Sequence, residues 1–142
     1  MPNEYIILPM FAMVIITFVT LITLFIARTT AVRSGAVRAG YFKTYQDQAE
    51  PEQSAKLSRH FINLFESPVL FYAVCLAALA TQNATTAFQV LAWLYVAARV
   101  VHAIIHLGAN ALQRRIAAYF VSWLIILAMW GLLCTAILKS AV

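Results

Sequence analysis

The sequence predicts an all-α membrane protein, a four-helix transmembrane bundle, and three observations carry that prediction. Of the 142 residues, 63% are hydrophobic and 11% are charged, and a soluble domain of this length has too little interior to cover that much apolar surface. Four apolar runs each approach or exceed the roughly 20 residues that a helix needs to cross the hydrocarbon core of a bilayer. Basic residues gather in alternate connections between these runs, which is typical of a multi-pass membrane protein.

The four apolar runs leave little of the chain outside the membrane. We expect spans at residues 5–27, 57–80, 86–107 and 116–138, in a single domain of residues 1–142 with a long connection at residues 28–56. The first run is too long for a signal peptide, and Asn3 and Glu4 stand where a signal peptide carries basic residues. We therefore expect four spans and no separate soluble domain.

The charges of the connections predict the topology. The connection at residues 28–56 is rich in Lys and Arg, the one at residues 108–115 carries Arg114 and Arg115, and the one at residues 81–85 has no charge. Because an excess of Lys and Arg marks the cytoplasmic side, we expect both termini to be non-cytoplasmic, in the inner membrane if the source is bacterial. The formal net charge of +5 then reflects topology and attraction to the lipid bilayer, and we expect no nucleic-acid partner.

The first span ends at Arg28. A basic residue at this boundary is explained if its side chain extends to the lipid phosphates. In the connection that follows, we expect the first half to extend the helix or to lie along the membrane surface. The second half is polar and acidic, and we expect a loop that ends near Pro51.

The second span begins with a polar stripe. Arg59, Asn63 and Glu66 stand at i, i+4 and i+7, so on a helix they project from one face. A charged side chain inside a membrane costs roughly 2.5–3.5 kcal/mol on insertion scales and normally faces the bundle interior. Either an internal ion pair or a polar pocket for a charged small molecule explains the stripe. Pro68 is expected to bend the helix just beyond Glu66.

The third span carries a second stripe, Arg99, His102 and His106, at i, i+3 and i+7. The two spans run antiparallel, so residues at similar depth should face one another. The expected pairs, from the membrane interior towards the cytoplasm, are Glu66 with Arg99, Asn63 with His102, and Arg59 with His106. We expect the first of these pairs to be a structural ion pair.

A metal site is the alternative for this stripe, because histidines at i and i+4 can bind zinc. A third ligand is hard to find from the sequence. Glu66 is already matched to Arg99, and His60 is expected to point away from His102 and His106. We therefore expect no metal ligands in this stripe.

Two motifs resemble those of the membrane-associated proteins in eicosanoid and glutathione metabolism, the MAPEG family. They are Arg59-x-x-x-Asn63-x-x-Glu66, with Pro68 soon after, and Arg99-Val-Val-His102-Ala-Ile-Ile-His106-Leu-Gly108. The resemblance extends to the lengths and placement of all four spans. It implies a homotrimer of four-helix bundles, with glutathione bound between neighbouring subunits near the cytoplasmic face.

The resemblance also implies a role for each residue of the site. Arg28 and Arg59 would bind glutathione carboxylates, Asn63 its backbone, and Glu66 its amino group or the neighbouring arginines, with Arg99, His102 and His106 completing the pocket. Arg115 would be catalytic, since a neighbouring cation lowers the pKa of a thiol from about 8.5 and favours the thiolate. The chain departs from the family at His106, where its enzymes usually have Tyr, and at Ile62, where one branch has Arg.

Three functions are compatible with the sequence. The first is a glutathione-dependent enzyme that conjugates lipophilic electrophiles or reduces lipid hydroperoxides. The second is a non-catalytic protein of the same fold that binds lipid or glutathione, with Arg115 serving only as a topology signal. The third is a small transporter, which is disfavoured because the polar residues gather in one leaflet. Enzyme activity is the favoured interpretation.

Overall fold

The computed structural model describes residues 2–46 and 49–140, and the described chain contains helices and no strands. A short 3₁₀ helix, η1, precedes the first long helix. The elements are η1 (Asn3–Ile6), α1 (Ile7–Arg33), α2 (Tyr41–Thr44), α3 (Glu52–Asn63), α4 (Ser67–Ala80), α5 (Thr86–Leu107) and α6 (Leu112–Ser140).

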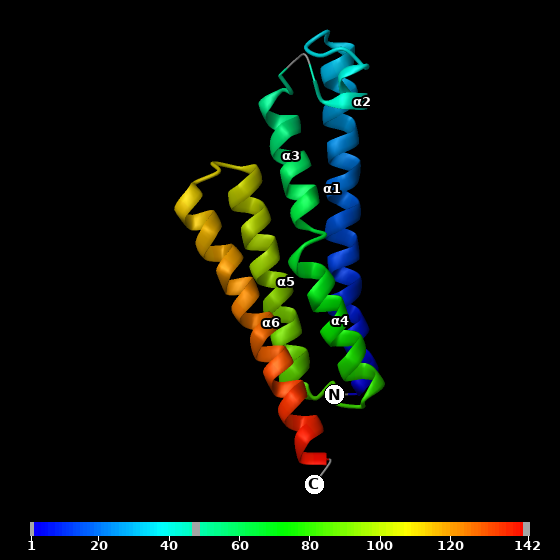
Figure 1. Cartoon of the computed structure of the whole chain (residues 1–142), viewed down its shortest axis with the longest axis vertical. Coiled ribbons are helices and arrows are strands. Elements are labelled where there is room, and N and C mark those ends of the chain that lie inside the picture. The colour runs from blue at the N-terminus through cyan, green and yellow to red at the C-terminus, as the bar shows by residue number, and fades with distance from the viewer. Residues whose placement is uncertain (1, 47–48, 141–142) are drawn as a thin grey trace.

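The helices form four long antiparallel runs (Figure 1). Four stretches are long and apolar enough to cross a membrane: Asn3–Arg33, Glu52–Ala80, Thr86–Leu107 and Leu112–Ser140. Both ends of the chain lie at one end of the bundle, whereas α2 and the turn between α5 and α6 lie at the other (Figure 1). The predicted fold class, an all-α four-helix transmembrane bundle, is confirmed.

The apolar core occupies the half of the bundle nearest the chain termini. Phe71 of α4 stacks on Tyr95 of α5 with ring centroids 4.3 Å apart, and Met13, Ile126 and other apolar side chains bury around them. The Tyr95 hydroxyl lies 3.0 Å from Ser67 Oγ, so its polar end is also satisfied. This packing holds the four runs together at one end and leaves the other end for polar residues.

The outer surface of the bundle is apolar along its length. Phe25, Ile104 and Leu138 are each about two-thirds exposed, at 65%, 67% and 68%. Apolar surface on this scale needs an apolar solvent. The chain is therefore an integral, multi-pass membrane protein whose outer face contacts lipid.

The second membrane run is interrupted in its middle. Helix α3 ends at Asn63 and α4 begins at Ser67, with Pro68 in its first turn. Proline has no N–H, and its ring clashes with the carbonyl of the residue four before it, which here is Leu64. The interruption therefore falls at residues 64–66, before the position just beyond Glu66 where the sequence predicted a bend. It breaks the single helical face on which Asn63 and Glu66 were expected to lie.

The connection between α1 and α3 packs back on the end of α1. Helix α1 continues to Arg33, and α2 follows after a turn. The Arg28 guanidinium lies over the rings of Phe42 and Tyr45, 5.1 and 5.6 Å from their centroids. These cation–π contacts tie the connection to the polar end of the bundle.

Candidate functional site

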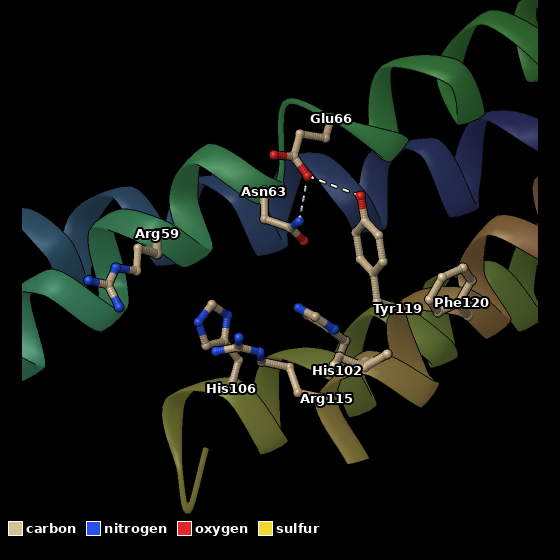
Figure 2. Close-up of a pocket in the computed structure, with 9 residues that line it drawn as sticks. Arg59, Asn63, Glu66, His102, His106, Arg115, Tyr119 and Phe120 are labelled. Carbon is tan, nitrogen blue, oxygen red and sulfur yellow. Dashed lines mark hydrogen bonds between the residues drawn. The ribbon is translucent and has the colours of Figure 1, made fainter. Parts of the chain in front are cut away.

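A cavity of about 400 Å³ lies between α3, α5 and α6 at the polar end of the bundle. Six of the eight site residues predicted from the sequence line it (Figure 2). Its full lining is Arg59, Asn63, Glu66, His102, His106, Arg115, Ile116, Tyr119 and Phe120. Helices α3 and α5 thus contribute polar side chains, whereas α6 contributes both polar and apolar ones.

Asn63 is the centre of a hydrogen-bonded chain in this cavity. Arg99 Nη2 donates to Asn63 Oδ1 at 2.6 Å, and Asn63 Nδ2 donates to Glu66 Oε2 at 2.7 Å. The Tyr119 hydroxyl donates to the same carboxylate oxygen at 3.1 Å (Figure 2). The amide therefore links a cation to a carboxylate, using its oxygen for one and its N–H for the other.

The predicted direct ion pair between Glu66 and Arg99 is wrong. In the described chain the ion pairs are Arg28 with Glu50 and Lys56 with Glu52. Asn63 lies between the two, accepting a hydrogen bond from Arg99 and donating one to Glu66. Asn63 and His102, another expected pair, both line the cavity.

Arg99 lies behind the cavity rather than in its lining. Its side chain is fully buried, and its Nε and Nη1 atoms have no hydrogen-bond partner among the described residues. A buried cation with unpaired donors is costly. Arg99 therefore makes this end of the bundle strongly attractive to negative charge and holds Asn63 in place.

The three histidines form a cluster across α3 and α5. The rings of His60 and His102 are stacked with centroids 6.0 Å apart, and His106 meets the His60 ring edge-on at 5.4 Å. The prediction that His60 points away from the other two is therefore wrong. His60 stands three residues before Asn63, a spacing that places the two on one helical face, and this signal was available in the sequence.

Arg59 and Arg115 place positive charge in the cavity lining. Arg59 is exposed and makes no hydrogen bond or ion pair within the described chain. Arg115 Nη1 donates to Asn110 Oδ1 at 2.7 Å, across the turn between α5 and α6. Glu66 is the only carboxylate in the lining, so the cavity has an excess of positive charge.

Arg28 does not reach this cavity. Its Nη2 donates to Ser58 Oγ at 3.1 Å, and its Nε lies 3.6 Å from Glu50 Oε1. A second cavity of about 560 Å³ is lined by both of these partners, Glu50 and Ser58, and Arg59 lines both cavities. Arg28 itself is in the lining of neither, so within one chain the two arginines predicted to bind glutathione carboxylates do not line one cavity together.

Sequence reasoning missed Tyr119, whose hydroxyl completes the chain of hydrogen bonds at Glu66. It stands four residues after Arg115, so the two share one face of α6. Ile116 and Phe120 of the same helix supply the apolar wall. The fourth span, which has no conspicuous polar stripe, thus contributes both charge and apolar surface to the site.

The fold and the cavity define a class of protein: a four-span helical membrane protein with a cationic, partly apolar cavity at one end of its bundle. The chain belongs to the MAPEG family, whose model matches residues 6–135. Membership points to glutathione-related lipid metabolism. Neither the comparison with curated proteins nor that with solved structures gives a match.

Proposed function

We propose that the protein is a glutathione-dependent membrane enzyme that acts on lipophilic electrophiles or lipid hydroperoxides, as a transferase or peroxidase. The observation that supports this proposal most directly is the cavity between α3, α5 and α6, whose lining combines the cations Arg59 and Arg115 with the apolar side chains of Ile116 and Phe120. Such a space suits an anionic thiol on one side and a lipophilic substrate on the other. Family membership supports glutathione as the thiol.

The charges of the lining fit glutathione, which carries two carboxylates and one ammonium group. Arg59 has its guanidinium donors available for a carboxylate, and charge-assisted bonds of this kind are the strong ones. Glu66 offers its carboxylate to the ammonium group. The cavity of about 400 Å³ is also within the usual range for small-molecule sites.

Asn63 and Tyr119 hold Glu66 in a fixed orientation. Both donate to Glu66 Oε2, which leaves Oε1 for a ligand. An amide nitrogen carries two hydrogens, so Asn63 has a second N–H for the ligand backbone. Preorganised groups of this kind lower the ordering cost of binding.

Arg115 is the residue assigned to catalysis. Bound glutathione supplies the sulfur nucleophile of this chemistry. A guanidinium beside a thiol stabilises its deprotonated form and so raises the fraction of nucleophile at neutral pH. Arg115 enters the lining from α6 and Arg59 from α3, and in this proposal the two serve different parts of the ligand.

A homotrimer completes the carboxylate clamp in this proposal. Arg28 of the same chain bonds to Ser58 and is outside the cavity lining, so a neighbouring subunit is the natural source of an Arg28 for each site. The basic connections then face the cytoplasm and both termini lie on the other side, in the inner membrane if the source is bacterial. The spans and the connection at residues 28–56 form one domain.

Calorimetry with glutathione on the detergent-purified protein tests the proposal, together with thiol-conjugation and hydroperoxide-reduction assays on the same sample. Saturable binding with turnover in either assay supports it. Absence of glutathione binding to a folded sample contradicts it. Lys139→Ala, at the opposite end of the bundle, is the matched control and should change neither measurement.

A non-catalytic glutathione- or lipid-binding protein is the second candidate. The bond from Arg115 to Asn110 favours it, because it gives Arg115 a structural role in the turn between α5 and α6. Binding without turnover in the same experiment would select this candidate.

A further inference from the structure

We propose that His60, His102 and His106 form a binding site for a divalent transition metal, with Zn²⁺ as the best match. One ring nitrogen from each histidine can be chosen so that the three atoms all lie within 4.8 Å of one another. The chain has three histidines in all, and all three meet here, from two helices. This site goes beyond the proposed function, and its test is made without glutathione.

The geometry is close to that of a coordinated metal. With Zn–N distances of about 2.0–2.1 Å, tetrahedral ligand nitrogens lie about 3.3–3.4 Å apart. Nitrogens that are already within 4.8 Å of one another therefore need to approach by about 1.5 Å at most, which side-chain rotations can supply. His102 and His106 stand one turn apart on α5, the i, i+4 spacing of many zinc-binding helices, and His60 of α3 faces them.

The rings are buried without hydrogen-bond partners. His60, His102 and His106 are 0%, 3% and 6% exposed. Within the described chain, five of their six ring nitrogens are buried and unpaired: both of His60, both of His102 and Nδ1 of His106. Buried polar atoms are normally satisfied, and leaving them unpaired is costly. A metal ion coordinated by one nitrogen of each ring would remove much of this cost.

The ligand set selects the class of metal. Three imidazoles suit zinc and its transition-metal neighbours, whereas Mg²⁺ and Ca²⁺ prefer oxygen ligands. The carboxylate of Glu66, which lines the cavity with His102 and His106, is engaged by Asn63 and Tyr119 through Oε2. Three histidines leave the fourth tetrahedral position for another ligand, as in catalytic zinc sites.

The surrounding charges define that fourth ligand. Arg59, Arg99 and Arg115 all act electrostatically on His106, and further positive charge beside them is unfavourable unless an anion accompanies it. His102 and His106 line the 400 Å³ cavity, so the fourth position faces this space. The site therefore binds the metal together with an anion in the fourth position. When no other anion is present, this ligand is hydroxide.

Metal titration of the protein tests the site. The full chain is purified in detergent without a polyhistidine tag, stripped with a chelator, and titrated with Zn²⁺ by calorimetry and with Co²⁺ by visible spectroscopy. We expect one equivalent per chain, and a Co²⁺ spectrum typical of tetrahedral coordination without a thiolate charge-transfer band. The substitutions His60→Asn and His106→Asn should each lower Zn²⁺ affinity by at least about 10²-fold, because loss of a group that only hydrogen-bonds to a metal ligand already costs 10- to 100-fold.

His60→Asn is the decisive substitution, since His102 and His106 alone could bind metal weakly on one helix. Cys75→Ser and Cys134→Ser are the controls for thiol ligands and should keep the affinity of the natural chain. An unchanged Zn²⁺ affinity in folded His60→Asn protein overturns the proposal. Loss of Zn²⁺ affinity in either cysteine variant also overturns it. If His60→Asn fails to fold, the natural chain still decides: failure to bind one equivalent of Co²⁺ in tetrahedral form overturns the site.

Discussion

Arg99 and Asn63 are joined by a hydrogen bond of 2.6 Å from a fully buried guanidinium to a side-chain amide oxygen. The amide in turn donates to Glu66, so the cation and the carboxylate are coupled through a neutral residue. A direct ion pair would neutralise both charges. The indirect arrangement instead fixes their positions and leaves the Glu66 carboxylate in the cavity lining, with the Arg99 charge buried behind it.

Asn63 should be energetically coupled to Arg99 more strongly than Glu66 is. Removing a partner of a buried charge costs about 3–5 kcal/mol, so Asn63→Leu and Arg99→Leu should each destabilise strongly. The double substitution should cost clearly less than their sum, whereas Glu66→Gln with Arg99→Leu should be closer to additive. Thermal unfolding of the four proteins in each cycle measures this. Stronger coupling in the Glu66 cycle would mean that those two side chains touch after all.

Tyr119→Phe should reduce stability modestly, because it removes the hydroxyl that donates to Glu66. A single hydrogen bond contributes about 0.5–1.5 kcal/mol net, and somewhat more to a charged acceptor. Tyr41→Phe is the matched control, since the Tyr41 hydroxyl makes no hydrogen bond within the described chain. Equal effects of the two substitutions on thermal unfolding would argue against a role for the Tyr119 hydroxyl.

Arg59→Ala should weaken glutathione binding by about 10- to 100-fold, the loss expected for one charge-assisted contact. Turnover at saturating glutathione should change less, because Arg59 is assigned to a carboxylate and not to the sulfur. Calorimetry and saturation kinetics separate the two effects. Arg33→Ala, at the end of α1 and outside the cavity lining, is the control and should leave both unchanged.

Arg115→Ala should lower turnover and leave glutathione binding largely unchanged, which is the opposite of the effect expected for Arg59→Ala. Affinity for glutathione should stay close to that of the natural chain, whereas turnover should fall on the order of 10²-fold, as for loss of one electrostatic stabiliser. Activity should recover partly at high pH, where a thiol with a pKa near 8.5 ionises unaided.

Arg114→Ala is the control for Arg115→Ala, because Arg114 adjoins it but lies outside the cavity lining. Ultraviolet absorbance of the bound thiolate across a pH titration reports the thiol pKa directly. An unshifted thiol pKa in the natural complex removes the basis of the catalytic assignment, even if turnover falls.

The trimer predicts complementation between chains. Arg28→Ala and Arg59→Ala homotrimers should both bind glutathione weakly. Trimers assembled from a mixture of the two chains should regain tight binding at some sites, where an intact Arg59 meets a neighbour's intact Arg28. Calorimetry on mixed and unmixed samples measures this, with native mass spectrometry to establish the oligomeric state. Failure of mixing to restore binding, or a monomer in mild detergent, contradicts the shared site.

The fold class followed from hydropathy because apolar runs of membrane length have few alternative structures. The family resemblance followed from two motifs and is confirmed by the match over residues 6–135. These features depend on local sequence, one run or one stripe at a time. For that reason they could be predicted without knowing how the runs pack.

The contacts within the site could not be predicted as reliably, because they depend on the helical phase on both sides of Pro68. Depth counted along two uninterrupted antiparallel helices placed Glu66 opposite Arg99, whereas the second run is broken at residues 64–66. The orientation of His60 depends on how α3 rotates against α5, which periodicity within α3 alone does not determine. Arg28 is drawn away by Glu50 and Ser58, which lie far from it in the sequence.

The interruption between α3 and α4 divides the second membrane run into two segments with different structural roles. The 14 residues of α4 include six buried side chains that pack the core, whereas the 12 residues of α3 bury three and carry much of the site. Substitutions in α3 can therefore alter ligand chemistry without repacking the interior. A lineage of such proteins can diversify through one short segment while the remainder of the membrane scaffold is inherited unchanged.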